Sequence, residues 1–333
     1  MSRATESYEK FNYAVRPSKQ VERKLLIEAL HYIGHNLDYP LREYRYLGFG
    51  SVYYTDFILL HKYLYLKDML CIEGSDVPRR MAFNKPYGFI RVKMGRLSVV
   101  LPRLNFKKPH IVWLDYDYGL DYGPAEQATS ILDDVRAVVG KLSSGSIFIV
   151  TAESEPKLSD RKENDRLSED ERETRLLELL EKTCGDILGR TISRSTLTKK
   201  EMPLLVASAL RNQILDTAIR VNSEGLRFFQ LFNFVYADGA QMVTVGGILD
   251  NASQGKALRE SGIYELDFIQ RRKEPIRISV PPLTIREKEA IDAQINQRTT
   301  AKSLRLKSEI KRNLLKNYLK YYKHYPTYHE AIL

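Results

Sequence analysis

The sequence predicts an α/β fold, with a mostly parallel sheet flanked by helices, an antiparallel final hairpin and a helical C-terminal extension. Apolar segments of strand length alternate with helical patterns between residues 44 and 152. Near-continuous apolar strands separated by helices are typical of a parallel sheet that helices cover on both faces. Within 226–249, two β-rich runs flank Ala-Asp-Gly-Ala, and an Asp-Gly pair between such runs is typical of a hairpin.

The first helix is expected at 18–33, where a serine precedes apolar residues at helical spacing. Apolar runs bounded by turn residues predict five strands, at 44–49, 68–74, 88–95, 110–117 and 146–152. The segments after the first four strands are expected to be helical, at 52–65, 77–84, 96–102 and 125–141.

The strand–helix alternation ends at residue 153. The following segment is dense in charges of both signs, which indicates a loop and then a solvated helix, and an apolar stripe predicts another helix at 203–222. An irregular stretch and a long basic helix from about 301 to 323 are expected near the end. These changes divide the chain into an N-terminal helical segment (1–40), a sheet domain (41–250) with a charged helical insertion (153–224), and a C-terminal extension (251–333).

The composition is typical of a soluble globular protein, with 43% hydrophobic and 28% charged residues among 333. No stretch approaches the roughly 20 apolar residues that span a bilayer, and residues 1–19 lack the apolar core of a secretory signal. Only two cysteines are present, and Cys71 lies inside an apolar run. A disulfide framework is therefore not expected, and a reducing, cytoplasmic location without membrane contact fits best.

The charge favours a polyanionic partner. The chain has 52 lysines and arginines against 42 acidic residues, a net charge of +10. The basic helix expected near the end carries tyrosines 318, 321, 322 and 325, which predicts contact with RNA or DNA through phosphates and stacked rings. A surplus of this size is also ordinary solubility chemistry, and a basic helix that docks on the domain or on a protein partner is the alternative.

Gly48-Phe49-Gly50-Ser51 joins the first strand to the next helix. Such a corner lets backbone approach a ligand closely, and the following helix offers unpaired N–H groups. Glu73 ends the second strand, where a carboxylate is placed to accept hydrogen bonds from a ribose diol. The alternatives are a tight turn and an exposed strand-end carboxylate.

Two further strand ends add to this pattern. Gly95 ends the third strand, and Asp115, Asp117 and Asp121 lie among tyrosines at the end of the fourth. Ligands of open parallel sheets bind outside the carboxyl ends of the strands, where the strand order reverses. We therefore expect these residues to meet the first two strand ends at one edge of the sheet.

In this order, the motifs resemble those of the class I S-adenosylmethionine (SAM)-dependent methyltransferases, of which the chain is identified as a divergent member. "YLGFGS" resembles their glycine motif, "CIEG" their ribose-binding acid, "VKMGRLSVVLP" their third motif and "VWLDYDYG" their fourth. "NFVYADGAQMVTVGG" resembles their last two strands. The resemblance implies a Rossmann-like sheet and SAM as cofactor, bound by Gly48, Gly50, Ser51, Glu73, Gly95 and Asp115.

Catalysis is expected at the fourth strand. Methyl transfer from a sulfonium needs mainly an in-line approach and an acceptor for a proton, and Asp115 or Asp117 is placed to orient or deprotonate a hydroxyl or amine. The resemblance extends to ribose methylases that pair a lysine with this aspartate, which makes Lys24 or Lys19 a candidate partner. The alternative is that these acids cap the next helix or pair with surface arginines.

Three functions remain open. The first is a SAM-dependent methyltransferase that methylates an oxygen or a nitrogen, with nucleic acid as one candidate substrate. The second is a catalytically inactive, methyltransferase-like subunit of a nucleoprotein or protein complex. The third is an NAD-dependent oxidoreductase. A metal site is not expected, because only His31 and His35 have helical ligand spacing and no third ligand is evident.

Overall fold

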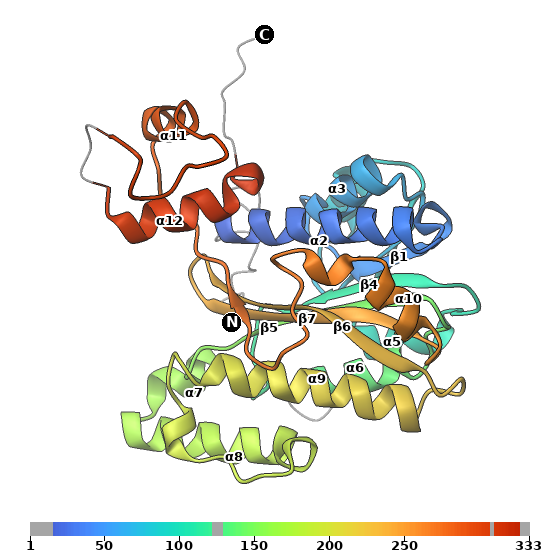
Figure 1. The fold of residues 1–333 in the computed structure, drawn as a ribbon. Helices are drawn as coiled ribbons and strands as arrows, with labels where there is room; N and C mark the ends of the chain where they lie inside the picture. The colour runs from blue at the N-terminus through green and yellow to red at the C-terminus, as the bar shows by residue number, and fades with distance from the viewer. Residues whose placement is uncertain (1–15, 122–128, 307–309, 327–333) are drawn as a thin grey trace.

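The computed structural model describes residues 16–121, 129–306 and 310–326. An eight-stranded sheet forms its centre, in the order β3-β2-β1-β4-β5-β7-β6-β8 (Figure 1). The strands are β1 (Arg45–Phe49), β2 (Asp68–Glu73), β3 (Ile90–Met94), β4 (His110–Asp115), β5 (Ser146–Glu153), β6 (Arg227–Ala237), β7 (Gln241–Asp250) and β8 (Ile276–Arg277).

The sheet is parallel except for one strand. The first five strands pair in parallel, whereas β7 runs antiparallel to both β5 and β6. The chain crosses from β3 at the edge to β4 beside β1, so the strand order reverses between β1 and β4. The predicted mostly parallel sheet with an antiparallel hairpin is confirmed, and the reversal point is where open α/β sheets bind ligands.

Helices cover both faces of the sheet (Figure 1). Their bounds are α2 (Pro17–Asn36), α3 (Thr55–Leu64), α4 (Pro78–Phe83), α5 (Leu97–Val100), α6 (Ile131–Val139), α7 (Arg161–Arg166), α8 (Glu169–Leu188), α9 (Met202–Arg220), α10 (Gln254–Glu260), α11 (Ile285–Asp292) and α12 (Arg312–Tyr321). The helix predicted at 125–141 begins at Ile131, after a capping box between Ser130 and Asp133; residues 125–128 lie outside the described part. Of the described helices, none combines the length and the apolar character needed to cross a membrane.

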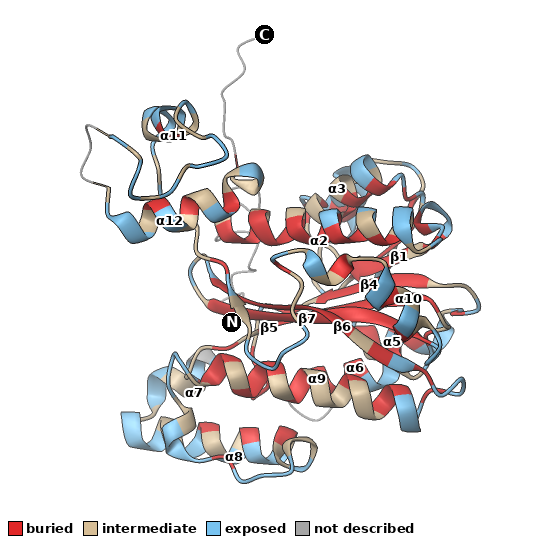
Figure 2. Cartoon of the chain, viewed as in Figure 1, coloured by how far each residue is buried: buried red, intermediate tan, exposed pale blue. Residues whose placement is uncertain are grey.

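Alternate residues of the central strands fill two separate cores. Leu47 and Val112 point into a core with α6 and α9, whereas Tyr46 and Ile111 point into one with α2 and α3. Successive strand side chains face opposite sides of a sheet, so one apolar run supplies both cores. Figure 2 shows the resulting buried layer of strands between the helices.

The basic helix near the C-terminus is shorter than predicted. α12 begins only at Arg312, and residues 307–309 lie outside the described part. Residues 301–303 form a turn instead, and the side chains of Thr300 and Ser303 accept each other's backbone N–H groups. Such side-chain-to-backbone bonds compete with the helical ladder.

Tyrosines of the same segment hold it to the rest of the chain. Tyr318 is buried and donates to Asp292 Oδ1 at 2.6 Å, and Tyr321 is buried and donates to the Arg277 carbonyl at 3.1 Å. These two rings are therefore packed inside and cannot stack on bases. The basic side chains of the segment stay exposed, at Lys311, Arg312, Lys316, Lys320 and Lys323.

Candidate active site

The hairpin turn between β6 and β7 positions the start of α2. The N-cap residue, Arg16, makes no side-chain capping bond. Instead, the carboxylate of Asp238 accepts the N–H groups of Ser18 at 3.1 Å and Lys19 at 2.8 Å. An acid at this position satisfies free helix donors and interacts favourably with the helix dipole. The Asp-Gly turn thus fixes where the first turn of α2 lies.

Lys19 points from that turn to the end of β4. Its Nζ donates to Asp115 Oδ1 at 2.7 Å and to the Tyr236 hydroxyl at 3.0 Å, and it pairs with Glu22 Oε2 at 2.9 Å. The ammonium also lies 4.5 Å from the centre of the Trp113 ring. Lys19 is only 1% exposed and Asp115 is 22% exposed, so Asp115 is the member of this group that reaches the sheet rim.

A chain of buried polar side chains continues from Glu22 into the sheet. Glu22 Oε1 accepts the hydroxyl of Thr244 on β7. The Thr244 hydroxyl lies 2.8 Å from that of Thr151 on β5, which accepts from Trp113 Nε1 at 3.1 Å. The other oxygen, Glu22 Oε2, is buried without a hydrogen-bond partner and is compensated by its ion pair with Lys19. The burial of this network therefore depends on the lysine cation.

The surroundings keep Lys19 charged. Burial by itself lowers the pKa of Lys19, but the carboxylates of Asp115 and Glu22 outweigh burial and hold the pKa well above its usual value. Burial raises the pKa of Glu22, with Lys19 opposing the shift. Lys19 is therefore a permanent cation that fixes Asp115, not a proton acceptor.

A pocket opens between the ends of β1 and β4, at the reversal in strand order. It is lined by Phe49, Gly50, Ser51 and Tyr54 on one side and by Asp115 on the other. Tyr54, the N-cap of α3, adopts a left-handed conformation with φ of 48° and gives the helix no side-chain cap. Its hydroxyl donates to the Met81 carbonyl at 2.8 Å. Strained non-glycine backbone of this kind is concentrated at functional sites.

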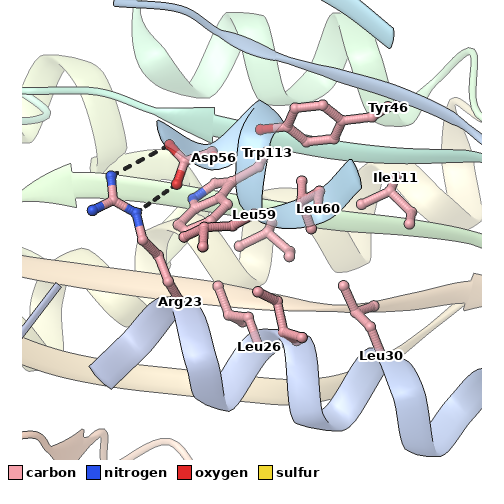
Figure 3. A pocket seen from close by; sticks show the side chains of 11 residues that line it. Arg23, Leu26, Leu30, Tyr46, Asp56, Leu59, Leu60, Ile111 and Trp113 are labelled. Atoms are coloured by element: carbon pink, nitrogen blue, oxygen red, sulfur yellow. Dashed lines mark hydrogen bonds and ion pairs between the residues drawn. The ribbon is translucent and has the colours of Figure 1, made fainter. Parts of the chain in front are cut away.

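The wall of the pocket includes an ion pair between two helices. Arg23 Nε of α2 donates to Asp56 Oδ1 of α3 at 2.6 Å, and Arg23 is 2% exposed. Burial lowers the pKa of Arg23, but Asp56 outweighs burial and raises it. Figure 3 shows this pair beside apolar side chains from both helices and the sheet, namely Leu26, Leu30, Leu59, Leu60, Ile111 and Trp113.

The two glycines of the corner have packing roles that the sequence does not reveal. A Cβ at Gly48 would meet the Tyr46 hydroxyl oxygen at 2.3 Å, and a Cβ at Gly50 would meet Cys71 Sγ at 2.2 Å. Both contacts point into the protein. A larger residue at either position would require the side chain of Tyr46 or Cys71 to move, and Gly50 also lines the pocket.

Glu73 and Gly95 lie side by side at the neighbouring strand ends. The Gly95 N–H donates to the Glu73 carbonyl at 2.8 Å, and Gly95 has a φ of 123°, which favours glycine. Glu73 Oε1 accepts the Ser75 N–H at 2.9 Å. Neither Glu73 nor Gly95 is among the described residues that line the pocket. Glu73 lies at the end of β2, next to β1, and Gly95 follows β3, one strand farther out.

The structure separates the two lysines and the two acids that the sequence left as alternatives. Lys19 contacts Asp115, whereas Lys24 Nζ donates to the Tyr325 carbonyl at 3.4 Å. Their separation of five positions along the helix turns the side chains to different sides of α2. Asp117 is exposed in the turn after β4.

Sequence reasoning missed the acids and hydroxyls that hold Lys19, namely Glu22, Tyr236 and Asp238. One signal was present: Lys19, Glu22 and Arg23 follow the same helical spacing as the apolar Leu26 and Leu30. Charged residues on the apolar face of a helix indicate a buried ion-pair network. The β6 and β7 partners carry no such signal, because their proximity to α2 depends on the completed sheet.

No curated protein matches the chain. Cofactor-bound Rv0187 from MTB is similar in structure, at 13% identity and a TM-score of 0.37, over 72% of this chain and 84% of that one. The tRNA methyltransferase TrmK of B. subtilis is 10% identical with a TM-score of 0.35, over 72% and 68%.

An S-adenosylmethionine dependent methyltransferase from Mesorhizobium loti is 17% identical with a TM-score of 0.25, over 34% of this chain and 47% of that one. The chain thus covers less than half of that protein. A family model described as "Putative O-methyltransferase" matches residues 11–333. Because this match spans nearly the whole sequence, the chain belongs to that family and is a member of the class I methyltransferase superfamily.

Proposed function

We propose that this chain is a SAM-dependent O-methyltransferase whose cofactor lies at the carboxyl ends of β1, β2 and β4. The observation that carries the proposal is the carboxylate of Asp115, which is held at the rim by a buried cation and lines the pocket at the strand reversal.

The donor set fits SAM in charge and position. At one end, the first turn of α3 presents uncapped N–H groups beside Ser51, which suits the carboxylate of the cofactor. At the other end, Asp115 suits a sulfonium cation, and Glu73 ends the strand where a ribose diol is bound in this fold. SAM supplies an electrophilic methyl group when bound.

Asp115 contacts the acceptor in this account. Its carboxylate accepts a hydrogen bond from the acceptor hydroxyl and takes the hydroxyl proton as the oxygen becomes methylated. Lys19 acts as a positioning residue, since it is buried and bonded to Asp115 Oδ1. The bond from Lys19 fixes Asp115 Oδ1 and so orients the carboxylate that lines the pocket.

Calorimetric titration with SAM, S-adenosylhomocysteine and NAD tests the cofactor. We expect the wild type to bind both SAM and S-adenosylhomocysteine, and Glu73→Ala to bind them roughly 10- to 100-fold more weakly, because hydrogen bonds to a charged acceptor are lost. Glu178→Ala, an exposed acid on α8, is the control and should bind as the wild type does. Binding of NAD alone would indicate an oxidoreductase, and binding of SAM without transfer to any acceptor would indicate an inactive subunit.

We further propose that the acceptor belongs to a nucleic acid. Figure 1 shows α12 beside the amino-terminal half of α2, and His324 Nε2 contacts Glu28 of α2 at 2.6 Å. Arg312, Lys316 and Lys320 are exposed along α12 at spacings of four residues, which suits contact with a phosphate backbone.

The salt dependence of RNA and DNA binding tests this second step. The double variant Lys316→Glu, Lys320→Glu should weaken binding of a labelled oligonucleotide and reduce the slope of log affinity against log salt by about two. The control is Lys199→Glu, Lys200→Glu, which changes two exposed lysines before α9. Equal effects of both pairs would show that α12 is not the contact surface.

A further inference from the structure

A second pocket lies on the opposite side of the sheet from Asp115. Its walls come from the end of α8, the middle of α9 and the loop after α10, and its volume is about 270 Å³. α9 packs in the core with α6, whereas Lys19 and α2 lie over the other face of the sheet. Figure 1 shows α8 and α9 together below the sheet. This pocket is thus separate from the proposed methyl-transfer site.

Three cationic side chains line it, from Arg190, Arg211 and Lys273. Among the described residues of its wall there is no carboxylate. Ser208 lies one helical turn before Arg211 on α9 and adds a hydroxyl donor. The pocket therefore concentrates positive charge and donors without a counter-ion from the described chain.

Arg211 is the residue that most clearly indicates a missing anion. Its Nε is buried and has no hydrogen-bond partner. Burial lowers the pKa of Arg211, with no neighbouring carboxylate to oppose the shift. Arg23 shows the contrast, since its buried guanidinium is paired with Asp56 and its pKa is raised. A partly buried, uncompensated guanidinium is unfavourable unless an anion completes the site.

The backbone that carries these cations is fixed. Asn233 on β6 is buried and donates to the carbonyls of Lys273 at 2.9 Å and Arg272 at 3.1 Å. Asn212 Nδ2 donates to the Ile187 carbonyl at 3.1 Å, which ties α9 to the end of α8 beside Arg190. Specific contacts thus hold the loop to β6 and α9 to α8 around the pocket.

We propose that this pocket binds the phosphate group of a small phosphorylated molecule, with Arg211 as the central contact. A guanidinium matches the planar pair of phosphate oxygens, and the flanking charges of Arg190 and Lys273 suit a dianion better than a single carboxylate. The proposal does not depend on the methyl-transfer function.

Thermal unfolding of the full chain in inorganic phosphate or pyrophosphate, at constant ionic strength set with chloride, tests it. We expect saturating phosphate to raise the wild-type Tm by about 4 °C or more. Arg211→Gln should abolish the rise. Arg220→Gln, an exposed arginine on the same helix paired with Asp216, should retain it.

Two further measurements keep the test decisive. Without phosphate, Arg211→Leu should be at least as stable as the wild type, because it removes an uncompensated charge; a marked loss of Tm would contradict the proposal. The last measurement repeats the thermal unfolding with a single-stranded oligonucleotide in place of phosphate. If the oligonucleotide gives an Arg211-dependent shift but phosphate and pyrophosphate do not, or if phosphate acts equally on Arg211→Gln, the small-molecule site is wrong.

Discussion

Asp115→Asn is expected to lower the rate of methyl transfer by about 10²- to 10⁴-fold, the usual contribution of a general acid–base group. In the wild type, Lys19 Nζ lies 2.7 Å from Asp115 Oδ1. The amide of the variant keeps an oxygen for this bond, but it cannot take the proton of the acceptor. Transfer of a labelled methyl group from SAM to total RNA, DNA and small hydroxyl compounds measures the effect once an acceptor is found.

Asp186→Asn, on exposed α8, serves as the control and should transfer at the wild-type rate. Asp117→Asn separates the two acids at the end of β4, and we expect the large loss only at residue 115. Asp115→Asn should also bind SAM more weakly than the wild type does, because the carboxylate that faces the sulfonium is lost. Its affinity for S-adenosylhomocysteine, which lacks that positive charge, should stay within a few-fold of wild type. A variant that keeps full activity would remove Asp115 from the mechanism.

Lys19→Met is expected to lower the free energy of unfolding by about 3–5 kcal/mol, the usual effect of removing one partner of a buried ion pair. Lys19 is 1% exposed and Glu22 is fully buried, so Glu22 would be left without its cation. Urea unfolding monitored by circular dichroism measures the change. Adding Glu22→Gln should recover part of it, because the isolated charge is then gone.

The loss should also depend on pH. Burial raises the pKa of Glu22 in the folded protein, so its contribution to stability is fully present below the unfolded value near 4.5 and falls as pH rises through the folded pKa. Without Lys19 the folded pKa rises further, and the deficit of Lys19→Met should grow as pH increases above about 4.5. Lys24→Met is the control. If Lys19→Met loses no more unfolding free energy than Lys24→Met does across the pH range, the buried network is contradicted.

The sheet was predictable because its strands are apolar on both faces and its hairpin carries Asp-Gly. The apolar run at 110–115 supplies Ile111 to one core and Val112 to the other, and such a run indicates a central strand from sequence alone. The helix predicted from residue 301 shows the limit, since the side-chain bonds of Thr300 and Ser303 outweigh its helical pattern.

The site was predictable only in part. Asp115 ends a buried strand at the expected edge, and Gly50 and Ser51 line the same pocket. Lys19 and Lys24 both belong to one predicted helix, and the neighbouring sequence does not show which of them faces β4. The choice depends on Asp238, which fixes the first turn of α2 from more than 200 residues away. Long-range capping of this kind leaves no trace in the local sequence.

A crystal structure of the full chain with S-adenosylhomocysteine tests the central claim most directly. The account predicts the cofactor product between the corner at Gly50 and Ser51 and the carboxylate of Asp115, with its ribose toward Glu73. If the molecule lies elsewhere, or if crystals soaked at saturating concentration show that pocket without it, the claim that methyl transfer occurs at this edge of the sheet is contradicted.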